Sequence, residues 1–132
     1  MTFGLDPSVV LRLLTGEPSE LATHALERYQ QGIANGDDFA VGDVVAAETY
    51  YALQHHYNKT KEEALAALTA FSAGEGISFS PDFRTAIKTP NLHRTGPCFV
   101  DRMLVSGYTS KGQVTLSCEK SFRRLSETEV IS

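Results

Sequence analysis

The hydrophobic residues of this chain alternate between short apolar runs and longer stretches in which they recur at helical spacing. Short apolar runs bounded by turn residues are typical of strands, and apolar residues three and four positions apart are typical of amphipathic helices. The pattern predicts strands at Thr2–Leu5, Phe39–Val41, Ile77–Ser80, Gln113–Ser117 and 130–131. It predicts helices at 9–14, 19–33, 44–57, 61–73, 81–88 and 99–108, with a loop at 89–97 and a turn at 122–125.

Polar residues mark where several of these helices begin. The segment from Thr60 to Glu63 has the Thr-x-x-Glu form of a capping box, and Ser80 stands before a proline that suits a first helical position. We expect Ser19 and Asp43 to cap two other helices. The helix after Asp43 is so apolar at its start that the pattern predicts burial from its first turn.

Strands that alternate with helices are typical of βαβ units, in which parallel strands form a sheet with helices on both faces. The prediction is a three-layer α/β/α fold with a short-stranded, mostly parallel central sheet. At 132 residues the chain has the length of one domain, spanning 1–132.

Composition supports a globular protein, since 42% apolar and 21% charged residues lie close to the averages for such proteins. No apolar run is long enough for a transmembrane helix, and the first residues lack the pattern of a signal peptide, so the expected location is the cytoplasm. Cys98 and Cys118 lack the paired spacing of a zinc site, and we expect both to be reduced and packed in the core.

Charge is divided unevenly along the chain, although the net charge is only −4. Residues 1–83 hold four Lys or Arg against twelve Asp or Glu, whereas residues 84–124 hold eight against two. This division suits a metal held by acids and a polyanion held by bases. Solvated surface charge explains it about as well.

Five carboxylates stand where predicted strands end or predicted helices begin: Asp6, Asp43, Glu48, Asp101 and Glu119. The carboxyl ends of parallel strands lie at one edge of a sheet, so carboxylates distant in sequence converge there. Clustered carboxylates repel one another unless a cation offsets their charge. Oxygen ligands without paired Cys or His suit Mg²⁺ or Mn²⁺.

Four segments, GLDPSVVLRLLTG, VGDVVAAETYYAL, FVDRMLV and TLSCEKSFRRL, together resemble the PIN-domain ribonucleases, and among them the VapC-type toxins of type II toxin–antitoxin pairs. The resemblance runs nearly from end to end. It implies that Asp6, Glu48, Asp101 and Glu119 are catalytic metal ligands and that Ser8 supports Asp6. Pro7 and Glu119 depart from the family, which usually has Thr or Ser and Asp at these positions.

The resemblance also implies an RNA substrate, Mg²⁺ or Mn²⁺ as cofactor, a cognate antitoxin and a homodimer. Three basic residues are candidates for contact with the RNA backbone: Arg12, Lys120 and Arg123. The alternative to an endoribonuclease is a catalytically degenerate PIN-like module that binds RNA or protein without cutting, because Glu119 and the turn at Pro7 have diverged.

Each acid also has a purely structural interpretation. Asp6 is a favoured type of helix cap, and Asp101 stands beside Arg102, with which it can pair. Glu48 lies in an apolar stretch, where a buried carboxylate requires a cationic partner. Glu119 fits equally well as a solvated turn residue.

Overall fold

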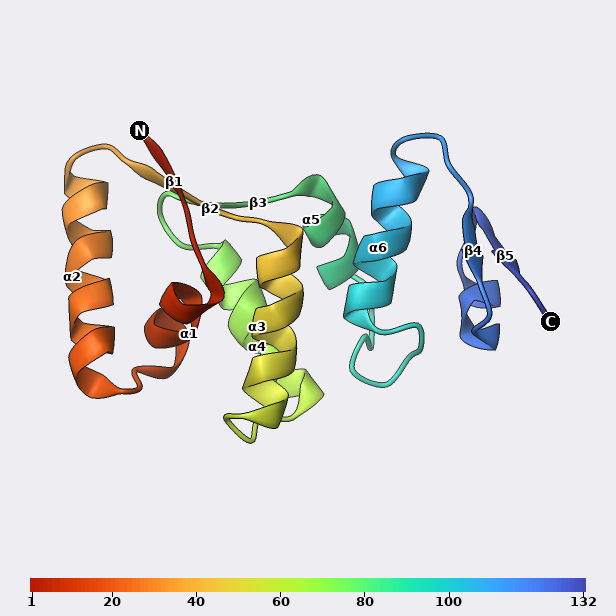
Figure 1. Cartoon of the computed structure of the whole chain (residues 1–132), viewed down its shortest axis with the longest axis horizontal. Coiled ribbons are helices and arrows are strands. Elements are labelled where there is room, and N and C mark those ends of the chain that lie inside the picture. Colours follow the sequence, from red (N-terminus) through yellow and green to blue (C-terminus); the bar gives the residue numbers. More distant parts are fainter. The chain divides into compact units, whose positions relative to one another are not determined.

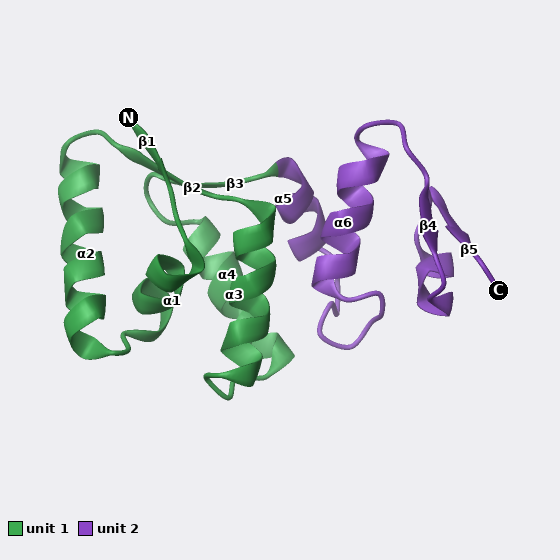
Figure 2. Ribbon diagram, viewed as in Figure 1, with its two compact units in different colours: residues 1–80 green, residues 81–132 purple.

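The computed structural model describes all of residues 1–132, which divide into two compact units, unit 1 (Met1–Ser80) and unit 2 (Pro81–Ser132) (Figure 2). Each unit has its own sheet and its own helices. The fold class is mixed α/β with short parallel strands, as the sequence predicts.

Unit 1 contains a three-stranded parallel sheet in the order β1-β2-β3, with four helices in the connections (Figure 1). Phe3 is in register with Phe39, and Phe39 with Ile77. The elements are β1 (Thr2–Gly4), α1 (Pro7–Thr15), α2 (Ser19–Ala34), β2 (Asp38–Val41), α3 (Asp43–His55), α4 (Lys61–Ser72) and β3 (Ile77–Phe79).

The core of unit 1 gathers apolar side chains from α1, β2, α3 and α4. Val10, Ala46 and Leu68 are fully buried, and Leu53 nearly so. On α3 the buried positions are Ala46, Thr49, Tyr50 and Leu53, which is the spacing of one helix face. Val44, which was predicted to be buried, is 71% exposed, because it lies on the first turn outside that face.

Gly32 brings α2 close to the sheet. A side-chain carbon at this position would collide with the Phe39 ring and would lie 3.1 Å from Nη1 of Arg28. Arg28 in turn stands over the ring of Phe3, 4.8 Å from its centroid. The absence of a side chain at Gly32 therefore sets how closely α2 approaches β2.

The predicted N-terminal caps of three helices can be compared with those in the structure. Thr60 Oγ1 accepts from the Glu63 amide at 3.1 Å, and the Glu63 carboxylate accepts from the Thr60 amide at 2.9 Å, so the predicted capping box is present. The predicted caps at Ser19 and Asp43 are wrong by one residue. Both are the first residues of their helices, and the N-caps are Pro18 and Gly42, which cap with no side chain.

Unit 2 contains α5 (Pro81–Ile87), α6 (Phe99–Thr109), β4 (Thr115–Ser117), the 3₁₀ helix η1 (Lys120–Arg124) and β5 (Thr128–Val130). The helices α5 and α6 pack through Phe83 and Phe99, whose rings meet edge to face at 5.5 Å. Strands β4 and β5 pair in parallel and form a separate two-stranded sheet. The strands thus form two sheets and not the single sheet that the hydrophobic pattern predicts, because strand pairing depends on contacts that local sequence does not specify.

Candidate functional site

Asp6 follows β1 and caps α1. Its Oδ2 accepts a hydrogen bond from the Ser8 amide at 3.1 Å and another from Ser8 Oγ at 2.6 Å. These two bonds, the hydroxyl first, hold the pKa of the exposed Asp6 carboxyl below its usual value. Asp6 is therefore a helix cap, and its carboxylate is oriented by Ser8.

The carboxyl edge of the three-stranded sheet gathers further polar groups. Asp43 and Ser80 follow β2 and β3, and Ser80 Oγ donates to Asp43 Oδ1 at 2.5 Å. Since β1 and β2 are neighbouring parallel strands, Asp6 and Asp43 lie at the same edge of one sheet. These two acids therefore share one sheet edge, and the convergence of the predicted metal ligands there stays a prediction.

Glu48 lies on α3, which packs against α1. Its side chain is exposed and forms no ion pair. The structural alternative, a buried carboxylate with a cationic partner, is wrong, because the buried face of α3 passes through Ala46 and Thr49 and leaves Glu48 in solvent. An exposed carboxylate is free to bind a cation or a water-bound ion.

Arg12 lies one turn after Ser8 on α1 and is half-buried. Its Nη1 donates to the Tyr57 hydroxyl at 3.5 Å, and its Nε is buried without a hydrogen-bond partner. Arg12 lines a largely apolar cavity of about 340 Å³, together with Ser8, His24 and Tyr29. The hydrophobic pattern alone does not predict this cavity, because the cavity forms between α1, α2 and β2, which are separate segments of the chain.

In unit 2, Asp101 lies in the first turn of α6 and is half-buried. Cys98, the N-cap of α6, donates from Sγ to Asp101 Oδ2 at 3.5 Å. The alternative that Asp101 pairs with Arg102 is wrong. Arg102 instead donates from Nε to the Pro97 carbonyl at 2.7 Å.

Glu119 is an exposed residue immediately before η1, and its amide donates to Ser117 Oγ at 3.0 Å. Lys120 and Arg123 follow within η1 and are also exposed. Neighbouring Cys118 is free and exposed, so the expectation that it packs in the core is wrong. The side chains of Glu119, Lys120 and Arg123 all face solvent.

The four predicted metal ligands divide between the units, with Asp6 and Glu48 in unit 1 and Asp101 and Glu119 in unit 2. Within either unit by itself, no group of three or more His, Cys, Asp or Glu side chains gathers closely enough to hold a metal ion. The chemistry of the donor set fits Mg²⁺ or Mn²⁺, because all four donors are carboxylates. The four-acid metal site stays a prediction.

No helix of the structure combines the length and the hydropathy that crossing a bilayer requires.

No protein-family model matches the chain, and no curated protein matches it. Among solved structures, the crystal structure of VapBC2 from Rickettsia felis bound to a DNA fragment from their promoter is similar, with 18% sequence identity over 99% of this chain and 98% of that chain. The TM-score of 0.41 is too low for us to infer fold or function from this likeness.

Proposed function

We propose that the chain is a metal-dependent endoribonuclease with a PIN-like fold and acts as the toxin of a type II toxin–antitoxin pair. The observation that carries the proposal is the Asp6 carboxylate, which is exposed, ionised and oriented by Ser8 at the carboxyl edge of a parallel sheet. The resemblance of the four sequence segments to PIN-domain ribonucleases supports the same assignment.

By the resemblance to PIN-domain ribonucleases, Asp6, Glu48 and Asp101 would hold one Mg²⁺ or Mn²⁺, and Glu119 would position a water or help to hold a second ion. When bound, such an ion would lower the pKa of a water and offset negative charge on the phosphoryl oxygens. Ser8 fixes the orientation of the Asp6 carboxylate through its two hydrogen bonds. Arg12, Lys120 and Arg123 bind phosphates of the RNA.

The proposal includes two protein contacts, a cognate antitoxin and a second copy of the chain, and a location in the cytoplasm. Apolar side chains on α2 support a protein contact, since Leu21 is 52% exposed and Leu26 is 47% exposed. Leu21 also lines the apolar cavity beside α1. Light scattering at high concentration tests the dimer, and a strictly monomeric species contradicts it.

The decisive experiment compares RNA cleavage by the wild type, Asp6→Asn and the control Glu27→Gln. Asn caps a helix about as well as Asp, so Asp6→Asn removes the charge and keeps the start of α1. We expect Mg²⁺-dependent cleavage that leaves 5′-phosphates in the wild type and the control, and no cleavage in Asp6→Asn. Glu27 is an exposed acid on α2 outside the proposed site.

A metal-binding measurement makes the test independent of the RNA chosen. Mg²⁺ or Mn²⁺ should raise the melting temperature of the wild type, because an ion that binds only the folded chain stabilises it by mass action. Asp6→Asn should show a smaller rise. Cleavage that persists in chelator, together with calorimetry that detects no metal binding, rejects the metal mechanism.

The second candidate is a PIN-like module that binds RNA or protein without cutting. The observation that favours it is the departure of Pro7 and Glu119 from the residues that are usual at these positions in PIN-domain ribonucleases. RNA binding that persists without cleavage in either Mg²⁺ or Mn²⁺ identifies this module.

A further inference from the structure

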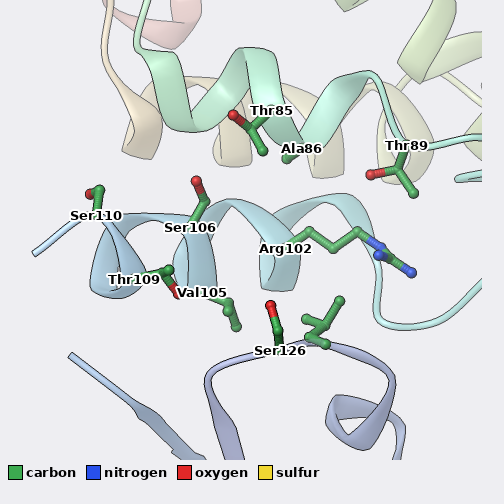
Figure 3. A pocket seen from close by; sticks show the side chains of 10 residues that line it. Thr85, Ala86, Thr89, Arg102, Val105, Ser106, Thr109, Ser110 and Ser126 are labelled. Atoms are coloured by element: carbon green, nitrogen blue, oxygen red, sulfur yellow. The ribbon is translucent and has the colours of Figure 1, made fainter. Parts of the chain in front are cut away.

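Unit 2 contains a cavity of about 320 Å³ that none of the predicted site residues lines. It is rich in hydroxyl groups. Figure 3 shows Thr85 and Ala86 on α5 facing Ser106 and Arg102 on α6, with Ser126 approaching from another segment. The hydroxyl-bearing lining residues are Thr85, Thr89, Ser106, Thr109, Ser110 and Ser126.

Most of these hydroxyls are available to a ligand. Ser106 Oγ donates to Asp82 Oδ1 at 2.7 Å and Ser110 Oγ donates to the Gly107 carbonyl at 3.0 Å, so both keep their lone pairs as acceptors. The other four hydroxyls form no hydrogen bond within the protein. The cavity therefore offers both donors and acceptors, which suits a polyhydroxylated ligand.

The one charged residue in the lining, Arg102, stands close to a second cation. Arg102 Nη2 donates to the Gly96 carbonyl at 3.3 Å, and Arg124 Nη1 donates to the same oxygen at 2.9 Å. Neither guanidinium forms an ion pair. Burial, and then the charge of Arg124, lower the pKa of Arg102 from its usual value.

Two guanidiniums on one carbonyl repel each other, and an anion between them removes that repulsion. A guanidinium has five N–H donors, of which Arg102 uses two on backbone carbonyls. The remaining donors match phosphate oxygens in geometry and charge. The chain continues directly from Arg124 into Leu125 and Ser126, which line the cavity.

We propose that this cavity binds a ribose phosphate, with the phosphate at Arg102 and Arg124 and the sugar hydroxyls on the threonine and serine side chains. Its volume is at the lower end of the range for small-ligand pockets. Ala86, Val105 and Leu125 supply the apolar part of the lining. The ligand is a free nucleotide or one nucleotide of an RNA strand, and only the second source rests on the proposed function.

The test is calorimetric titration of the full chain, in chelator, with adenosine 5′-monophosphate, adenosine and a short single-stranded RNA. Arg124→Gln removes one guanidinium, and Thr109→Val removes one hydroxyl at nearly constant shape. Arg84→Gln is the matched control, because Arg84 is exposed on α5, lies outside the lining and carries the same charge. Arg102 is left in place, since it holds the Pro97 carbonyl as well as the Gly96 carbonyl, whereas Arg124 holds only the Gly96 carbonyl.

We expect the wild type and Arg84→Gln to bind the monophosphate or the RNA alike, and adenosine more weakly. Arg124→Gln should lose about tenfold or more in affinity, and Thr109→Val less. Binding of the monophosphate identifies a free nucleotide, and binding of RNA alone identifies a strand. Absence of binding to both, or unchanged binding in Arg124→Gln, overturns the proposal. If the chain binds the monophosphate or the RNA but shows no Mg²⁺-dependent cleavage, the result supports the binding site in this cavity and rejects only the proposed nuclease activity.

Discussion

The two units of the molecule differ in the sign of their net charge and in how their charged side chains are held. Unit 1 has eleven Asp or Glu and four Lys or Arg, whereas unit 2 has five and eight. In unit 1 an acid is fixed at a sheet edge by Ser8, and in unit 2 two guanidiniums meet at the Gly96 carbonyl. Acids are therefore in excess in one unit and bases in the other, a division that the net charge of −4 does not reveal.

The largest expected effect comes from large-to-small substitutions in the two cores. They test whether each unit unfolds independently of the other. Phe83→Ala in unit 2 should cost about 3–5 kcal/mol, because it removes a buried ring that packs on Phe99. Hydrogen exchange should show the lost protection mainly in residues 81–132.

Leu68→Ala is the matched change in the core of unit 1, where it should lower protection mainly in residues 1–80. Equal loss of protection throughout the chain after either substitution means that the two units unfold as one. That outcome favours the single domain predicted from the sequence.

Glu119 tests whether unit 2 contributes an acid to catalysis. If Glu119 positions the attacking water, Glu119→Gln should lower kcat by about 100-fold while circular dichroism stays unchanged. Glu119→Asp should retain activity, since it keeps the carboxylate. Wild-type rates in Glu119→Gln at saturating Mg²⁺ reduce the proposed site to Asp6, Glu48 and Asp101.

The capping box of α4 offers a smaller effect confined to unit 1. Thr60→Ala should lower the free energy of unfolding by about 1 kcal/mol, because the Glu63 amide loses its side-chain acceptor. Urea unfolding measures this change. Thr69→Ala, on the same helix, is the comparison, and an equal loss in both variants shows that the cap has no special role.

The smallest expected effect is a change in the titration of Asp6. Ser8→Ala removes the hydroxyl bond and keeps the amide bond, so the pKa of Asp6 should rise toward its usual value. Because the folded-state pKa is depressed, ionised Asp6 stabilises the fold above the unfolded-state pKa. That contribution is lost as pH falls through the folded-state pKa.

Carboxyl NMR titration measures the shift. Glu63 serves as an internal control, because its pKa is also depressed, but by hydrogen bonds with Thr60 rather than with Ser8. A pKa of Asp6 that does not move in Ser8→Ala shows that the hydroxyl does not stabilise the carboxylate.

Features set by neighbours in sequence were predictable, and features set by distant contacts were not. The capping box at Thr60 and the position of Asp6 after β1 follow from a few adjacent residues. The exposure of Glu48 depends on which face of α3 packs inward. Because the sequence is apolar on both sides of Glu48, the hydrophobic pattern does not show which face that is. Arg102 and Arg124 lie 22 positions apart and meet only through the loop carbonyl of Gly96.

The close approach of α2 to β2 at Gly32 has a consequence for sequence variation. Alanine is normally preferred over glycine inside a helix by about 1 kcal/mol. At Gly32 that preference is reversed, because the added carbon collides with the Phe39 ring. In a mutational scan this interior helical position should therefore accept no replacement, while neighbouring exposed positions of α2 tolerate many.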